Sequence, residues 1–477
     1  MEAGLPAERL TRSRPAPGVG IVHLGLGAFF RAHGAIYIAE AVAASGGDWG
    51  IVGVSLRSPG MRDALAPQGF AYTAVELGPE GETAEVVEVV RNVLVAREDP
   101  GAVLAAMADP DVRIVTLTVT EKGYCYQPAN RQLDLTHPDI AHDLAHPLPR
   151  SAPGFLVRAL EHRRAAGLRP FTVLTCDNLP SNGHLVRGIV LDLARAIDIG
   201  LADWIAAEAR FPGTMVDRIV PATTSDDIAK VERLTGRSDA APVLHEPFRQ
   251  WVVEDDFVGG ARPELGAVGV ELVGDVTPYE HMKLRMLNGT HSALAYLGFL
   301  AGHETVADTV ADPVFATFVR SLWAREIIPA IEAPPGVDLA AYAEALLDRY
   351  QNPAIRHRTW QIAMDGSQKL PQRLLGTIAD GLEAGRPVSG LCLAVAGWMR
   401  YVGGTDETGS PIDVRDPMAG RLRALAEEAD PVTALLGVRE VFPGPLAARL
   451  AEPVAEAYAR LEAVGARGAV AEFGGVA

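Results

Sequence analysis

The sequence predicts an α/β domain with a mostly parallel sheet, followed by a mainly α-helical domain. Two observations lead to this fold class. In the first 277 residues, short apolar runs alternate with helical stretches, which is the pattern of βαβ units whose sheet is covered on both faces. From residue 278 onward, alanine- and leucine-rich segments dominate, with proline and glycine between them. We therefore expect a sheet domain over 1–277, with 1–18 flexible, and a helical domain over 278–477.

The expected elements follow from the hydrophobic pattern. Four apolar runs are predicted strands, at 20–24, 49–54, 114–119 and 171–175. The predicted helices lie at 32–44, 155–166, 292–300, 315–331, 339–350, 371–383, 422–429 and 446–463. The apolar run 391–398 is shorter than the roughly 20 residues that a membrane-spanning helix needs, so we predict a buried helix there.

The first predicted strand ends in a glycine-rich turn. Gly25 and Gly27 follow the strand directly, and a helical stretch begins soon after them. Such a turn brings backbone N–H groups close to a pyrophosphate and opens a Rossmann-type dinucleotide-binding unit. The residues predicted to bind the cofactor here are Gly25, Gly27, Ala28 and Phe29. Phe30 stands where the third glycine of the motif usually lies, and an ordinary strand–helix turn is the alternative.

The second predicted strand bears on the choice of cofactor. The acidic residue that usually binds the adenosine ribose is missing from the Ser-Leu-Arg-Ser segment 55–58. Arg57, with Ser58, could face a 2′-phosphate, or Arg57 could stack on the adenine ring. We include Arg57 among the cofactor-binding residues and expect NAD as the cofactor, with NADP left open.

A lysine segment early in the second domain carries the expected chemistry. At about 100° per residue, Asn288 lies roughly 140° and His291 roughly 80° around a helix from Lys283, so all three share one side. A lysine can exchange a proton with a hydroxyl, an amide can donate to an oxyanion, and an imidazole can orient the substrate, all without a metal. General-base work requires the lysine pKa to fall from ~10.4 toward ~7–8. A solvated lysine and a satisfied histidine on an ordinary helix are the alternative.

Further motifs run in order over most of the chain. They are LGLGAFFRAH at 24–33, TVTEKGY at 118–124, TCDNLPSNG at 175–183, the segments 211–219 and 246–251, the lysine segment, and DGSQK at 365–369. Together they resemble the long-chain mannitol dehydrogenase family of polyol-specific oxidoreductases. The resemblance implies a Rossmann-type domain and a helical domain, with NAD(P) and no metal. It implies that Lys283 is the catalytic lysine, and the other implied site residues are Asn178 and Asn288 for the oxyanion, His291 for the substrate and Asp217 near the nicotinamide.

Within the family, three stretches are most similar to fructuronate reductases, which are also called D-mannonate oxidoreductases. They are 120–125, 283–291 and 357–371. The implied reaction is the reversible reduction of a keto-hexuronate, D-fructuronate, to D-mannonate. Its carboxylate needs a cation, and the predicted substrate-binding residues are Lys122, Arg358 and Lys369. For Lys122, a role in positioning a loop is the alternative.

Two departures from the family pattern keep other functions open. Family members usually have histidine at the position of Phe30, and polyol-oxidising members tend to have arginine at that of Gln361. A mannitol-, sorbitol- or arabinitol-type polyol 2-dehydrogenase is therefore the alternative. A catalytically silent nucleotide-binding protein is a second one, although such a protein would have no chemical need for the retained lysine, asparagines and histidine.

Composition limits the partners. The chain has 43 Lys+Arg and 60 Asp+Glu, a net charge of −17, which argues against nucleic acid as a partner. The three cysteines are far apart, which favours a reducing compartment over disulfides, and no histidine pattern predicts a metal site. His142 and His146 are interpreted as surface residues of a loop. We expect a cytoplasmic protein without membrane contact, a monomer or weak oligomer, that acts on a small sugar acid or polyol.

Overall fold

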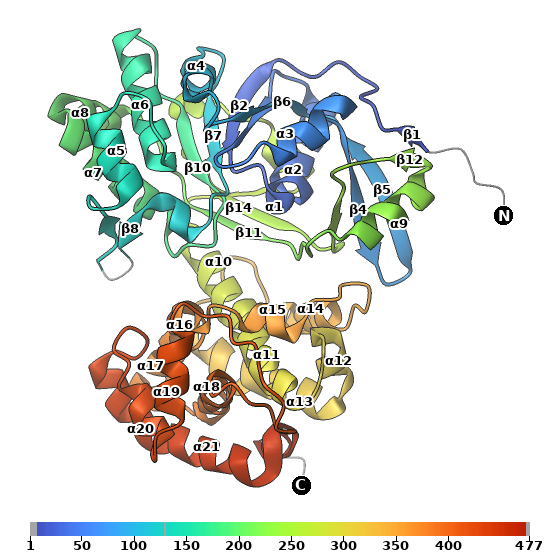
Figure 1. Cartoon of the computed structure of the whole chain (residues 1–477), viewed down its shortest axis with the longest axis vertical. Coiled ribbons are helices and arrows are strands. Elements are labelled where there is room, and N and C mark those ends of the chain that lie inside the picture. The colour runs from blue at the N-terminus through green and yellow to red at the C-terminus, as the bar shows by residue number, and fades with distance from the viewer. Residues whose placement is uncertain (1–6, 128–129, 474–477) are drawn as a thin grey trace. The chain divides into compact units, whose positions relative to one another are not determined.

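The computed structural model describes residues 7–127 and 130–473, and the chain divides into two compact units, Met1–Thr277 and Pro278–Ala477 (Figure 1). The N-terminal unit is built on a five-stranded sheet with the strand order β10-β7-β2-β3-β6. Every neighbouring pair in this sheet is parallel, which confirms the predicted parallel sheet. Its strands are β2 (Val19–Leu24), β3 (Gly50–Ser55), β6 (Val90–Val95), β7 (Ile114–Leu117) and β10 (Thr172–Thr175).

Helices cover both faces of this sheet. The helices of this unit are α1 (Ala28–Ala32), α2 (Gly34–Ser45), α3 (Gly60–Leu65), α4 (Pro100–Ala108), α5 (Pro138–Ala145), α6 (Ala152–Ala165), α7 (Asn182–Ile197), α8 (Ile199–Glu208) and α9 (Ser225–Thr235). Alternation along β2 divides the core between the faces. Val22 packs in one cluster with Val103 of α4 and Phe155 of α6, whereas Ile21 packs in another with Ile36 of α2. The stretch around His142 is the helix α5, so the interpretation as a loop is wrong.

Smaller sheets complete the N-terminal unit, and the sequence analysis did not predict them. Their strands are β4 (Tyr72–Gly78), β5 (Gly81–Val87) and β13 (Val243–His245); β11 (Thr214–Asp217), β14 (Gln250–Glu254) and β15 (Glu271–Val273); β8 (Tyr126–Gln127) and β9 (Gln132–Leu133); and β1 (Glu8–Arg9) and β12 (Arg237–Ser238).

Part of the N-terminal segment that we expected to be flexible makes specific contacts. The strand β1 pairs with β12, and the Arg12 guanidinium donates to the carbonyl oxygens of Gly69, Glu88 and Val90. Residues 1–6 of that segment lie outside the described part of the chain.

The C-terminal unit is helical, and no strand occurs in its described residues, 278–473, which confirms the predicted helical domain. Its helices are α10 (Thr277–Met282), α11 (Thr290–Leu300), α12 (Val306–Ala311), α13 (Pro313–Leu322), α14 (Leu339–Tyr350), α15 (Thr359–Ala363), α16 (Gly366–Leu370), α17 (Gly376–Glu383), α18 (Ser389–Val402), α19 (Ala419–Ala426), α20 (Pro431–Leu436) and α21 (Gly444–Phe473).

The core of this unit surrounds α18, which contains the predicted buried apolar run. Nearly all residues of α18 are buried, and the helix packs against α11, α19 and α21 (Figure 1). None of the helices in the described part of the chain has the length and apolar character that crossing a membrane requires.

Three π-helical segments interrupt the helical pattern of this unit. They are Lys283–Gly289, Trp323–Ile327 and Pro371–Leu375. The second lies within the predicted helix 315–331, and the third opens the predicted helix 371–383.

Candidate active site

The first π-helical segment carries the predicted catalytic lysine. Lys283 begins this segment, Asn288 lies near its end, and His291 follows on the first turn of α11. The predicted α-helical spacing is wrong here, because hydrogen bonds of a π-helix connect residues five apart. Asn288 therefore lies about one turn after Lys283, on the same side, rather than roughly 140° around the helix. Lys283 itself is buried, with 5% of its surface exposed.

Side chains from one neighbouring and two distant residues stabilise this wide turn. The carbonyl oxygen of Met286 accepts hydrogen bonds from Trp323 Nε1 at 3.0 Å and from Thr290 Oγ1 at 2.5 Å. The carbonyl oxygen of Leu287 accepts one from the Tyr350 hydroxyl at 3.0 Å. The wider helix alters the usual backbone hydrogen bonding, and these side chains supply buried partners for the carbonyl groups. Helices α11 and α14 thus help to fix the shape of the lysine segment.

His291 lies buried beside this segment with a free ring nitrogen. Its ring centroid is 4.7 Å from that of Tyr350 and 5.3 Å from that of His357. Within the described residues, its Nε2 atom has no hydrogen-bond partner. Burial, followed by the charges of His357 and Arg373, lowers the pKa of His291 well below its usual value. The imidazole is therefore neutral near pH 7, and a sugar hydroxyl could satisfy the nitrogen that the protein leaves unpaired.

A partly buried arginine that the sequence analysis missed lies in the same cluster. Arg373 Nη1 donates to Ser292 Oγ at 3.3 Å, and burial lowers the pKa of this guanidinium. A Cβ added to Gly289 would lie only 2.8 Å from the Arg373 carbonyl oxygen, so the two segments pack tightly. None of the ion pairs in the described residues includes Arg373. The sequence signal that could have found it is its spacing, since it follows Lys369 by four residues, about one helical turn.

The three predicted substrate-binding cations lie in three different parts of the structure. Lys369 lies in the cluster with Arg373, and burial together with that guanidinium lowers the pKa of Lys369 to about 8. Arg358 lies at the surface instead, since its side chain is 54% exposed and its Nε atom is 3.6 Å from a carboxylate oxygen of Glu304. Lys122 belongs to the N-terminal unit, where it lines a cavity together with Arg57.

The glycine-rich turn has the geometry of a cofactor loop. Gly25 has a φ of 92°, and a Cβ there would lie 2.2 Å from the Thr118 carbonyl oxygen, so glycine is required. Gly27 precedes α1, whose first two residues are Ala28 and Phe29. This places the four residues predicted to bind the cofactor at one end of β2.

A stacked pair explains why the motif lacks its third glycine. The Phe30 ring stacks on the His23 ring with centroids 3.4 Å apart, directly beneath the turn. The His23 ring nitrogens contact Thr116 Oγ1 at 2.8 Å and Thr118 Oγ1 at 3.0 Å. Burial lowers the pKa of His23 to about 3, so this support stays neutral.

Asn178 follows the strand β10, and Asp217 ends the strand β11. Asn178 is exposed just after β10, and Asp217 is the last residue of β11. Asn182 Nδ2 donates to the carbonyl oxygens of Asp177 and Thr214, at 3.1 and 2.9 Å, and so joins the two segments. The Asp177 carboxylate in turn accepts hydrogen bonds from the backbone after β7. Asn178 therefore follows a residue that Asn182 holds in place, whereas Asp217 lies at the other end of β11 from Thr214.

No group of three or more metal-binding side chains occurs in the described residues. The three cysteines are free and buried. Burial raises the pKa of the Cys125 thiol to about 12 and that of Cys176 further still, so neither is poised as a nucleophile.

Comparison with known proteins assigns each of the two units to a known domain family. The profile of the mannitol dehydrogenase Rossmann domain matches residues 19–266, and that of the mannitol dehydrogenase C-terminal domain matches residues 275–462. The chain is 46% identical to the D-mannonate oxidoreductase of Escherichia coli (strain K12) over 481 residues, covering 99% of each chain. It is 40% identical to the mannitol 2-dehydrogenase of Phaeosphaeria nodorum, covering 97% of this chain and 83% of that one.

A solved structure shares the whole architecture. It is the Pseudomonas fluorescens mannitol 2-dehydrogenase in a ternary complex with NAD and D-mannitol. The TM-score is 0.89 at 38% identity, covering 98% of this chain and 97% of that chain. The chain therefore belongs to the mannitol dehydrogenase family and is an oxidoreductase that acts on CH–OH groups.

Proposed function

We propose that the enzyme interconverts D-fructuronate and D-mannonate with NAD as cofactor, and that Lys283 is its general acid/base. The observation that carries the choice of a sugar acid is the partly buried guanidinium of Arg373, which has no ion-pair partner in the described residues. Desolvating a cation without a counter-ion costs free energy, and a substrate carboxylate would compensate its charge. A neutral polyol offers no such charge. The 46% identity to a D-mannonate oxidoreductase supports the same choice.

The glycine-rich turn fits the proposed cofactor. Only a residue without a Cβ can occupy position 25, which leaves the backbone open to a pyrophosphate. Asp217 and Asn178 would lie toward the nicotinamide end by resemblance to the family. NAD(H), when bound, accepts or supplies the hydride.

The remaining chemistry falls to side chains of the protein. In the reductive direction, Lys283 Nζ gives a proton to the carbonyl oxygen as it becomes an alkoxide. The amides of Asn178 and Asn288 donate hydrogen bonds to this oxygen while its negative charge develops. In the oxidative direction, the neutral amine of Lys283 takes the hydroxyl proton. His291 binds a neighbouring sugar hydroxyl through the unpaired Nε2 atom.

A polyol 2-dehydrogenase is the second candidate. The overall match to a mannitol 2-dehydrogenase that holds D-mannitol favours it. The glutamine at position 361, where polyol-oxidising members tend to have arginine, speaks against it.

Steady-state oxidation of NADH with fructuronate, tagaturonate and fructose tests the proposal. We expect kcat/KM for fructuronate to exceed that for fructose by about 100-fold, as for a site that depends on one hydrogen bond between charged groups. Turnover of fructose alone would establish the polyol enzyme, and preference for tagaturonate would overturn the choice of sugar acid. Tight NADH binding without turnover of any sugar would indicate a silent protein.

A further inference from the structure

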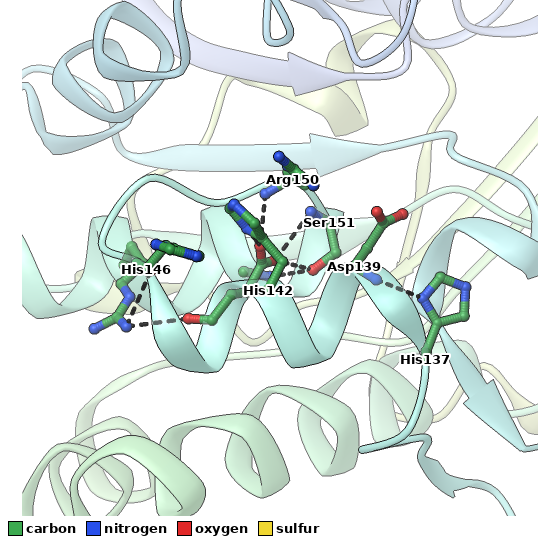
Figure 2. A network of polar contacts seen from close by, with 9 residues as sticks. His137, Asp139, His142, His146, Arg150 and Ser151 are labelled. Carbon is green, nitrogen blue, oxygen red and sulfur yellow. Dashed lines mark hydrogen bonds and ion pairs between the residues drawn. The ribbon is translucent and has the colours of Figure 1, made fainter.

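A cavity of about 860 Å³ opens at the carboxyl ends of neighbouring strands in the N-terminal unit. Arg57, which follows β3, and Arg97, which follows β6, line it from one side. Lys122, after β7, lines it from another. Figure 2 shows the wall that α5 and the loop before α6 form, with His142 and Arg150 among its residues. The cavity thus collects side chains from several crossover segments of the Rossmann-type sheet.

The four cations of this cavity, Arg57, Arg97, Lys122 and Arg150, take part in no ion pair within the described residues. Two carboxylates next to them in the chain are committed elsewhere. Glu98 pairs with Arg62, and Asp99 caps α4 by accepting from the Ala102 backbone at 2.8 Å. The cations are therefore available to a ligand.

A carboxylate of α5 that does not line the cavity, that of Asp143, is also committed. The Asp143 carboxylate accepts hydrogen bonds from the backbone N–H groups of Arg150 and Ser151, at 2.7 and 3.0 Å, and from the Ser151 hydroxyl at 2.6 Å. Among the described residues, Asp139 is the one carboxylate that lines the cavity. In a chain with a net charge of −17, this cavity is a local excess of positive charge.

The position of the cavity is that of the adenosine end of a dinucleotide in a Rossmann-type unit. In Rossmann-type units, the adenosine ribose lies at the carboxyl end of the second strand, where an acidic side chain selects the free 2′-hydroxyl of NAD. Here β3 is that strand, and Arg57 stands in a segment without an acid. Leu56, Ala96 and Phe155 give the cavity apolar surface that suits an adenine ring. Its volume falls within the roughly 300–1,000 Å³ of small-molecule sites.

We propose that this cavity binds the adenosine end of the cofactor and that Arg57 and Arg97 bind a phosphate on its 2′-hydroxyl, so that the enzyme accepts NADP(H) as well as NAD(H). The inference rests on the proposed function only in that the chain uses a nicotinamide cofactor. NAD can bind as well, because an arginine can donate a hydrogen bond to the free 2′-hydroxyl in place of the usual contact with an acidic residue. The contact that distinguishes NADP(H) from NAD(H) is the recognition of a phosphate monoester by guanidinium groups.

Titration calorimetry with two nucleotide fragments tests this assignment. The probes are 2′,5′-ADP and 5′-AMP, which differ only in the 2′-phosphate. We expect the wild-type protein to bind 2′,5′-ADP at least about 10-fold more tightly than 5′-AMP, as one charge-assisted hydrogen bond gives. Arg57→Ala and Arg97→Ala should each weaken 2′,5′-ADP about 10- to 100-fold and 5′-AMP less than about threefold.

Two further variants sharpen the outcome. Arg57→Asp should abolish the preference for 2′,5′-ADP, since it adds a repelling charge. Arg164→Ala is the matched control, because Arg164 lies on α6, pairs with Asp198 and does not line the cavity. It should change neither affinity.

Equal binding of the two probes by the wild-type protein would overturn the proposal. So would an equal loss of both probes in Arg57→Ala, because Arg57 would then contact the adenine rather than the phosphate. Neither probe contains a nicotinamide or a sugar acid. Tight 2′,5′-ADP binding by an enzyme that does not turn over fructuronate would therefore refute the proposed substrate and leave this inference standing.

Discussion

Replacing Arg373 with methionine separates recognition of the substrate carboxylate from support of the fold. A hydrogen bond to a charged group contributes about 1.5–3 kcal/mol. At 1.36 kcal/mol per factor of ten, its loss lowers kcat/KM for fructuronate about 10- to 150-fold. Fructose has no carboxylate, so its kcat/KM should change less than about threefold in the same variant.

The same substitution should leave stability nearly unchanged. Arg373 has a hydrogen bond to the Ser292 hydroxyl at 3.3 Å but no ion pair within the described residues, so its removal leaves no carboxylate unpaired. Replacing a buried charge by an apolar side chain of similar size is often neutral or stabilising. We expect the free energy of unfolding, measured by urea denaturation, to change by less than about 1 kcal/mol or to rise.

The assay is NADH oxidation with each sugar, with Arg358→Met as the matched control. Arg358 is exposed and lies near Glu304, so its loss should leave both substrates unaffected. Equal losses for fructuronate and fructose in Arg373→Met would refute the reasoning, because they would mark a merely structural arginine. A selective loss of fructuronate turnover in Arg358→Met would move the carboxylate contact to that residue.

Three regions of the site give four further predictions. Lys283→Ala should lower kcat about 10²- to 10⁴-fold while NADH binding, followed by fluorescence, persists; near-normal turnover would contradict its role. Because Lys369 is charged below its pKa of about 8, KM for fructuronate should rise above that pH, whereas KM for fructose should stay flat. Gly25→Ala should abolish NADH binding or folding, since its Cβ would lie 2.2 Å from the Thr118 carbonyl oxygen; retention of both would refute the steric argument. The pKa of His23 falls to about 3 in the folded protein from about 6.5 unfolded. The stabilisation by neutral His23 is thus complete above pH 6.5. Below that pH, the free energy of unfolding should fall by about 1.4 kcal/mol per pH unit until about pH 3, and urea titrations of wild type and His23→Gln can compare this fall.

Local sequence signals predicted the parts of the fold that depend on local chemistry. The strand at 20–24 and its glycine turn were predictable because β-branched residues and closely spaced glycines have few other uses in a short segment. The helix 339–350 coincides with α14 for the same reason, a regular apolar period. The small sheets were not predictable in this way, because β4 pairs with β13 about 170 residues later in the chain.

In the candidate site, too, local motifs were predictable and features that depend on tertiary packing were not. Lys283 and His291 were identifiable because they belong to a dense motif. The π-helical turn that sets their spacing depends on hydrogen bonds from Trp323 and Tyr350, which no pattern within the lysine segment reveals. Arg373 was missed because an arginine in a leucine-rich helical stretch normally faces water, and its partial burial is a property of the tertiary packing.

The wide turn at Lys283–Gly289 also makes the site sensitive to backbone geometry as well as to residue identity. A π-turn holds one more residue than an α-turn between hydrogen-bonded partners. If this segment changed into a regular α-helix with all its residues kept, everything after it would rotate by about 100° relative to Lys283. His291 would then lie roughly 80° around the helix from Lys283, although both side chains were retained. The alignment of the two side chains thus depends on contacts that hold the wide turn open, and not on the two residues alone.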